Sequence, residues 1–202
     1  MAEILKANDA GYLKAAELLR AGALVALPTD TVYGLAGLAS NQNAIAEIYA
    51  VKNRPKHKAL SVIVFAPKHA RRLVKISPLA QALMDAFWPG ALTLVLPAFK
   101  DVPTLAVRCP DIGWARGFLD VGFEGPLVLP SANLSGKPAP VTAAQTADAI
   151  GDKIPLILDG GTCKRGKEST IIAVDGDRAR LLRVGAISPQ RLAAFDIDMD
   201  LT

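Results

Sequence analysis

The sequence predicts an α/β (α+β) fold, with flanking helices on one twisted mixed β-sheet in a single domain over residues 1–202. In the first half, apolar runs of strand length alternate with segments of helical period, and in the last third strand-like runs follow one another. The 202 residues are 51% hydrophobic and 21% charged, which is typical of a globular chain of one domain. We find neither a repeat nor a low-complexity linker that would divide it.

The first half carries helices with recognisable ends. A helix is expected over residues 8–22, with Asp9 as its N-cap and Gly22 just beyond its end. An apolar strand over 23–28 follows it. The remaining elements expected in this half are a helix over 41–52 capped near Asn41, a strand over 60–65, and a helix over 77–88 that starts at Ser77 and Pro78.

The second half is richer in strands. Two of them, over 92–97 and 105–110, each end in a proline. Further strands are expected over 126–133, where the strand runs into a polar turn, and over 155–161, 169–176 and 178–185. Helices are expected over 111–120, over 142–151 starting at Thr142, and over 188–195.

Positive charge is concentrated in one segment. The net charge is +4, and the stretch from Ile48 to Met84 contains no Asp or Glu. Such a segment attracts anions such as nucleotides, phosphates or RNA, although charge alone is equally compatible with a solvated surface. The cations of this segment are Lys52, Arg54, Lys56, Lys58, Lys68, Arg71, Arg72 and Lys75.

Several classes of protein are disfavoured by composition. No apolar run reaches the roughly 18 residues that a membrane span needs, and the N-terminus lacks a signal-peptide core, so we expect a cytoplasmic protein. Cys109 and Cys163 lack metal-ligand spacing and are expected to be reduced thiols. Because the two histidines, His57 and His69, lie in the basic segment, we predict no histidine-ligated metal site.

The stretch ALPTDTVYGLA, residues 26–36, places polar groups directly after an apolar strand. Hydroxyl and acid groups stand at Thr29, Asp30, Thr31 and Tyr33. If the segment is extended, Thr29, Thr31, Tyr33 and Leu35 share one face, because the side-chain period of a strand is two. Thr31 is then the candidate for recognising a ligand, whereas Tyr33 and Leu35 are expected mostly to pack against the rest of the protein.

Three further polar stretches lie at the ends of expected elements, where α/β proteins build their sites. KNRPKHKAL carries Lys52, Arg54 and Lys58, whose ammonium and guanidinium groups suit a polyphosphate. PSANLSG can present hydroxyls and backbone N–H groups in a loop. Its polar side chains are Ser131, Asn133 and Ser135. The third stretch, KESTIIAV with LLRVG after it, supplies Ser169, Thr170 and Arg183.

Two apparent motifs do not hold. Residues 161–168, GTCKRGKE, approach a P-loop, but Glu168 stands where a Ser or Thr would hold magnesium, and the β-branched residues that follow suit a strand. A hydrolase built from Ser131 and Lys137 lacks an evident general base.

Taken together, these stretches resemble the YrdC/TsaC family of L-threonylcarbamoyladenylate synthases. The resemblance runs from about Gly22 to Ile187 and includes eight motifs in the family order. They are PTDTVYGL, KNRPKHKAL, FWPGALTLVLP, LAVRCPD, PSANLSGKPAP, LILDGG, EST and LLRVGA. The resemblance implies a single YrdC-like domain with a basic concave groove.

The resemblance also implies an activity and a set of site residues. The family condenses L-threonine, bicarbonate or CO2, and ATP into threonylcarbamoyl-AMP and pyrophosphate, for threonylcarbamoyladenosine modification of tRNA. Magnesium would be held mainly by the ATP phosphates. Catalytic roles would fall on Lys52, Arg54 and Lys58, ATP contacts on Arg54, Lys58, Thr104, Ser131, Asn133 and Arg183, and threonine contacts on Thr31, Arg108 and Ser169, with Ile63 and Leu129 adding backbone or packing. The fork of Arg108 suits the threonine carboxylate.

Three positions depart from the family pattern and leave affinity and loop rigidity open: Ala59, Ala139 and Val184. Implied partners besides the substrates are tRNA or double-stranded RNA and the proteins that transfer the threonylcarbamoyl group, with no membrane. Two other functions stay open. One is a non-catalytic module that binds tRNA or double-stranded RNA, and the other is a carbamoyl-transfer domain. Few aromatic residues (5%) weaken base stacking as a mode of RNA binding.

Overall fold

The computed structural model describes residues 1–100 and 102–200, which fall into two compact units. Unit 1 comprises Met1–Leu60 and Ile112–Gly166, and unit 2 comprises Ser61–Asp111 and the chain from Lys167 onward. Each unit combines a mixed parallel and antiparallel sheet with helices, which confirms the predicted fold class. The expectation of one domain over residues 1–202 remains a prediction.

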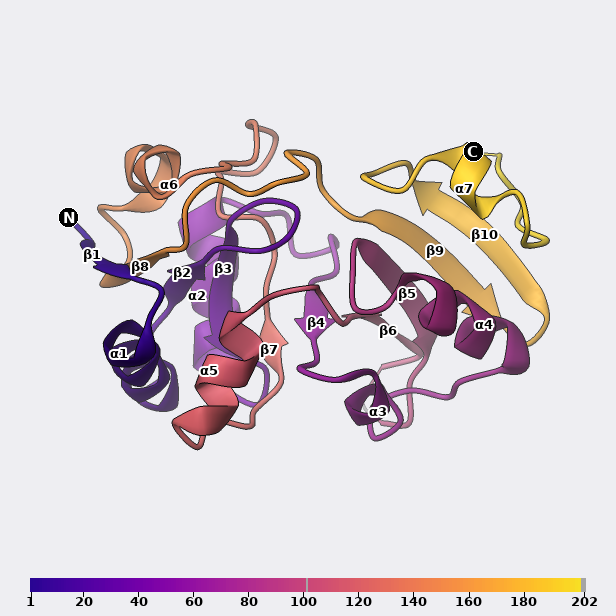
Figure 1. Ribbon diagram of the computed structural model, residues 1–202, viewed down its shortest axis with the longest axis horizontal. Helices are drawn as coiled ribbons and strands as arrows, with labels where there is room; N and C mark the ends of the chain where they lie inside the picture. The colour runs from indigo at the N-terminus through magenta and orange to yellow at the C-terminus, as the bar shows by residue number, and fades with distance from the viewer. Residues whose placement is uncertain (101, 201–202) are drawn as a thin grey trace. The chain divides into compact units, whose positions relative to one another are not determined.

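The sheet of unit 1 has the strand order β1-β8-β2-β3-β7. Strand β8, drawn in orange, lies between β1 and β2 although it is far from both in sequence (Figure 1). The β1–β8 and β8–β2 pairs are parallel, whereas the β2–β3 and β3–β7 pairs are antiparallel. The strands are β1 Glu3–Lys6, β2 Val25–Leu27, β3 Gly34–Leu38, β7 Leu127–Val128 and β8 Leu156–Asp159.

The helices described in unit 1 are α1 Asp9–Arg20, α2 Gln42–Lys52, α5 Trp114–Asp120 and α6 Ala143–Ile150. Helix α1 contacts β2, β3, β8 and α5, while α2 contacts β3 and α6 contacts β8. The N-caps expected at Asn41 and Thr142 are confirmed, since both side chains accept hydrogen bonds from the first turn. The expected N-cap Asp9 is wrong. Asn8 has the extended backbone of a cap and its side chain accepts from the Gly11 amide, so Asp9 is already helical.

The sheet of unit 2 has the strand order β4-β6-β5-β9-β10. The β4–β6 and β5–β9 pairs are parallel, and the β5–β6 and β9–β10 pairs are antiparallel. The strands are β4 Ser61–Ile63, β5 Leu92–Pro97, β6 Thr104–Arg108, β9 Thr170–Asp175 and β10 Arg178–Arg183. The helices are α3 Pro67–Ala70, α4 Pro78–Phe87, whose expected cap at Ser77 is confirmed, and α7 Pro189–Leu192.

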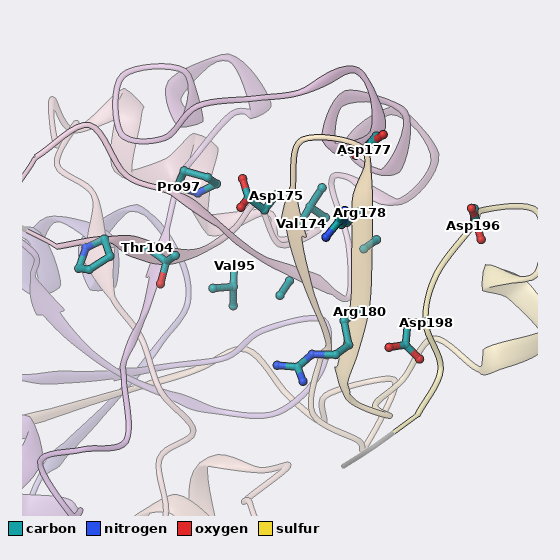
Figure 2. Close-up of a pocket in the computed structure, with 13 residues that line it drawn as sticks. Val95, Pro97, Thr104, Val174, Asp175, Asp177, Arg178, Arg180, Asp196 and Asp198 are labelled. Carbon is teal, nitrogen blue, oxygen red and sulfur yellow. The ribbon is translucent and has the colours of Figure 1, made fainter.

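The two faces of the unit 2 sheet differ in what covers them. Alternate residues of β5, Leu92, Leu94 and Leu96, lie in a buried apolar cluster together with residues of α4 and α7. Val95 and Pro97 point to the opposite face, where they line an open pocket of about 760 Å³ (Figure 2). This open face of the unit 2 sheet also carries Thr104.

Several helices and strands differ from those expected from the sequence. Strands β1 and β3 and helix α3 were not expected, and the strand expected over 126–133 is reduced to Leu127–Val128. Helix α2 ends through Asn53, which adopts a left-handed backbone (φ 48°), two residues before the proline that was expected to stop it. Within the described residues, no helix has the length and apolarity needed to cross a membrane.

Candidate functional site

A single hydroxyl shapes the turn between β2 and β3 in unit 1. Thr29 Oγ1 lies 2.6 Å from the Val32 carbonyl oxygen, to which it donates, and accepts from the Thr31 and Val32 amides at 3.1 and 3.2 Å. Such local bonds compete with strand pairing and bend the backbone. The extended segment expected here, with Thr29, Thr31, Tyr33 and Leu35 on one face, is therefore wrong. Thr31 Oγ1 lies 2.9 Å from Thr29 Oγ1.

The segment that resembled a P-loop packs on this turn. The Gly166 amide donates to the Thr31 carbonyl at 3.1 Å, and Arg165 Nε lies 3.4 Å from Asp30 Oδ2. Tyr33 is fully buried, as its packing role predicted, and its hydroxyl donates to the Gly161 carbonyl at 2.8 Å. Burial raises the pKa of Tyr33 to about 12. These contacts hold the turn and the loop together as one structure within unit 1.

Lys52 is the most deeply buried of the predicted cations. Its side chain is 1% exposed, and its ammonium donates to the Ser131 carbonyl, to the Asn133 carbonyl at 2.6 Å and to Asn133 Oδ1 at 3.3 Å. Its own carbonyl accepts from the Ser135 amide at 2.8 Å. An ammonium has three protons, and the loop that carries Ser131 and Asn133 supplies an acceptor for each. The structure thus brings Lys52, Ser131 and Asn133 together.

The other two cations of this motif are less buried. Arg54 donates from Nε to the Lys58 carbonyl at 3.1 Å and from Nη2 to the Ala59 carbonyl at 2.9 Å. Tyr49 also donates to the Lys58 carbonyl, at 3.1 Å. The Lys58 side chain is exposed, and we find no partner for its ammonium in the described part of the chain. Of the three, Lys58 is the most accessible to a ligand.

In unit 2, Arg108 is held by the turn that precedes β5. Its side chain is buried, and Nε donates to the Gly90 carbonyl at 2.9 Å. The Gly90 amide in turn donates to the Cys109 carbonyl at 2.8 Å, and the Trp88 indole donates to the Leu92 carbonyl at 2.7 Å. The FWPG part of the motif therefore fixes where the Arg108 guanidinium lies.

Ser169 and Arg183 form the second group of unit 2. Arg183 donates from Nε and Nη2 to the Ser169 carbonyl at 3.1 and 2.9 Å, and from Nη1 to Glu168 at 3.0 Å. The buried Ser169 Oγ lies 2.8 Å from Thr93 Oγ1. A Cβ on Gly185 would lie 2.3 Å from the Ser169 carbonyl carbon, so only glycine permits this close approach.

Thr104 lies apart from these groups, in the pocket on the open face of the unit 2 sheet (Figure 2). Arg178 and Arg180 line the same pocket, but so do four aspartates, Asp175, Asp177, Asp196 and Asp198. This mixed charge is not that of a basic groove, and the groove implied by the resemblance remains a prediction. Among the described residues, no three His, Cys, Asp or Glu side chains are grouped as metal ligands.

Sequence reasoning gave no role to the neighbours that bond to the predicted residues, although it had named Thr29 as a polar group. Thr29, Gly90 and Thr93 each touch a predicted threonine contact or its backbone. Thr29 could have been found from the Thr-x-Thr spacing at the end of a strand, which favours a hydroxyl turn. Thr93 gives no such signal, because its partner Ser169 is 76 residues away in sequence.

Comparison with known proteins finds one matching family model and relatives that share one name. The family model Sua5/YciO/YrdC, described as "Telomere recombination", matches residues 17–185. The threonylcarbamoyl-AMP synthase of Bacillus subtilis is 39% identical over 94% of this chain, and that of Pyrococcus abyssi is 40% identical over 86% of it. The matches span 58% and 53% of these relatives, so the chain covers little more than half their length.

A solved structure agrees with the sequence matches. The P. abyssi Sua5 structure complexed with L-threonine has a TM-score of 0.85 and 36% identity, and the match covers 91% of this chain and 58% of that one. Motif order, the family model and the solved structure agree, and the chain belongs to the Sua5/YciO/YrdC family.

Proposed function

We propose that the chain is an L-threonylcarbamoyladenylate synthase, a nucleotidyltransferase that makes threonylcarbamoyl-AMP from L-threonine, bicarbonate or CO2, and ATP. The observation that carries the proposal is 36% identity to a protein whose structure contains L-threonine. The names of the B. subtilis and P. abyssi relatives point to the same product.

The proposed reaction needs no nucleophile from the protein. An oxygen of the carbamate formed from threonine attacks the α-phosphorus of ATP, a new P–O bond forms, and the bond to the β-phosphate oxygen breaks to release pyrophosphate. The protein has to orient the two substrates and stabilise the negative charge that develops. Magnesium bound to the ATP phosphates would supply further positive charge.

Individual residues suit particular groups of these substrates. In unit 1, the exposed Lys58 suits a phosphate, while Lys52 and Arg54 shape the loops that carry Ser131 and Lys58. In unit 2, the buried Arg108 suits a carboxylate, because a guanidinium can hold both of its oxygens. Thr31 and Ser169 are the proposed hydroxyl contacts to threonine, and Arg183 and Thr104 are proposed contacts to ATP.

The product would serve threonylcarbamoyladenosine modification of tRNA in the cytoplasm. Transfer proteins and tRNA or double-stranded RNA are the partners that this role requires. The RNA-binding module and the carbamoyl-transfer domain remain the competing functions.

The test is pyrophosphate release by the purified chain with ATP, bicarbonate and Mg²⁺, measured with and without L-threonine. We expect release that depends on threonine, together with a product whose mass is that of threonylcarbamoyl-AMP. RNA binding without such release would favour the non-catalytic module. Release stimulated by carbamoyl phosphate and not by threonine would favour the carbamoyl-transfer domain.

A further inference from the structure

The buried hydroxyls of Thr93 and Ser169 form a hydrogen bond that can run in either direction. Thr93 is 2% exposed and Ser169 is 6% exposed, so bulk water is a poor partner for either. Their oxygens are 2.8 Å apart, and one hydroxyl must donate to the other. The direction of that bond decides what Ser169 can offer to a ligand.

Ser169 Oγ already accepts one hydrogen bond from the protein. Arg183 Nη2 lies 3.3 Å from it and can only donate. If Thr93 donates as well, Ser169 accepts twice and its own proton is directed to a third partner. If Ser169 donates instead, the Thr93 proton lacks an acceptor in the described chain and Ser169 has no proton to offer a ligand. Each direction thus leaves one buried proton of the pair without a protein acceptor, and only the first lets an accepting ligand at Ser169 satisfy it.

The position of Thr93 in the sheet places Ser169 next to another donor. Thr93 lies between Leu92 and Leu94, which pair with Thr170 on β9 and Val107 on β6. On β9 the partner of Thr93 is Ile171, and Ser169 lies two residues earlier, on the same face of the sheet, where its hydroxyl reaches Thr93 at 2.8 Å. On the other side, the β5–β6 register continued by one residue sets Thr93 opposite Arg108 at the end of β6. Ser169 and Arg108 are both proposed threonine contacts.

We propose that Thr93 is a positioning residue that fixes the Ser169 hydroxyl as a hydrogen-bond donor to the carboxylate of the amino-acid substrate, beside Arg108. The inference rests on the proposed function, since it assumes that threonine contacts Ser169 and Arg108. A donor is the useful polarity here, because carboxylate oxygens only accept, and bonds to charged groups are the stronger ones.

The first test is Thr93→Val, which keeps the shape of the side chain and removes the hydroxyl. Thr146→Val is the matched control, because Thr146 is also fully buried and its hydroxyl donates to the Thr142 carbonyl at 2.9 Å, within unit 1. By calorimetry we expect Thr93→Val to weaken L-threonine binding about tenfold, the scale of one bond to a charged group. The control should leave binding unchanged, and the KM for ATP should not rise in either variant.

Three further measurements test whether Thr93 acts through the Ser169 hydroxyl and the substrate carboxylate. Thr93→Ser keeps a hydroxyl and should restore binding. In a Ser169→Ala background, Thr93→Val should cause no further loss, because the hydroxyl it orients is absent. Binding of L-threoninol, which lacks the carboxylate, should be the same in wild type and Thr93→Val. If Thr93→Val lowers the melting temperature more than the control does, Thr93→Ala replaces it in each arm.

The outcomes separate this inference from the proposed function. Wild type that binds no threonine and releases no threonine-dependent pyrophosphate overturns both. Wild type that binds threonine, with Thr93→Val indistinguishable from Thr146→Val, overturns the role of Thr93 alone. An equal loss with and without Ser169, or an equal loss for threoninol, also overturns it, since Thr93 would then act through packing.

Discussion

The surroundings of Lys52 and those of Lys58 differ sharply, although the two residues belong to one basic segment. Lys52 is buried, and its ammonium is bonded to the loop of residues 131–133. Lys58 is exposed, and its backbone carbonyl, not its ammonium, is bonded to Arg54 and Tyr49. A run of positive charge in a sequence thus contains both a cation that organises the protein and one that remains available to a ligand.

The largest effect is expected from Lys52→Met. Methionine fills the space but leaves the Ser131 and Asn133 carbonyls without their donor, so we expect a loss of about 3 kcal/mol in the free energy of unfolding. Urea denaturation measures it, and Lys56→Met, at an exposed position of the same segment, is the control. A loss no greater than that of the control would show that the buried ammonium does not stabilise the loop.

Lys58→Ala should give the opposite pattern. Removing an exposed ammonium should leave the free energy of unfolding within about 0.5 kcal/mol of wild type. ATP affinity should fall about tenfold, because a charged contact to phosphate is lost. Calorimetry with ATP and Mg²⁺ measures this, again with Lys56→Ala as control. Unchanged ATP affinity would show that the nucleotide does not bind at Lys58. The contrast between Lys52 and Lys58 would then be one of burial alone.

Tyr33 provides a smaller test of buried polar groups that bond to the backbone, as Lys52 does. Its pKa is raised by burial to about 12, whereas a tyrosine in the unfolded chain ionises near pH 10. The folded state therefore holds the proton more tightly, so the contribution of Tyr33 to the free energy of unfolding should be constant below pH 10 and fall between pH 10 and 12. We expect this slope, about 1 kcal/mol per pH unit at most, to be shallower in Tyr33→Phe. Equal slopes by urea denaturation at pH 9, 10 and 11 would exclude a shifted Tyr33.

The contrast between local and long-range contacts also decides what the sequence could predict. The caps at Asn41, Ser77 and Thr142 were predicted correctly, because a cap is set by residues within one turn. Strand β5 was predicted with its observed bounds from apolar residues before a proline. Strand β1 was missed because EILK is short and half charged, and it becomes a strand only by pairing with distant β8.

The same difference between local and long-range contacts applies to the site residues. The four polar stretches were found because each is contiguous in sequence. What the sequence could not show is that Lys52 points into the protein, or that Thr93 and Gly90 orient Ser169 and Arg108. Those relations depend on strand register and on the path of the turn before β5, which local composition does not encode.

The length of strand β6 limits which ligands could contact the residues at both of its ends. Thr104 and Arg108 are its first and last residues, and by the alternation of the strand both lie on the face opposite Val107, which packs in the apolar cluster. Thr104 is exposed there, whereas Arg108 is buried. Four residues of strand separate their Cα atoms by about 13 Å. A free amino acid is too short to bridge that span, whereas threonine joined through a carbamoyl group to a nucleotide is long enough. On the proposed assignments, threonylcarbamoyl-AMP would contact both Thr104 and Arg108, whereas ATP alone would contact Thr104 and threonine alone would contact Arg108.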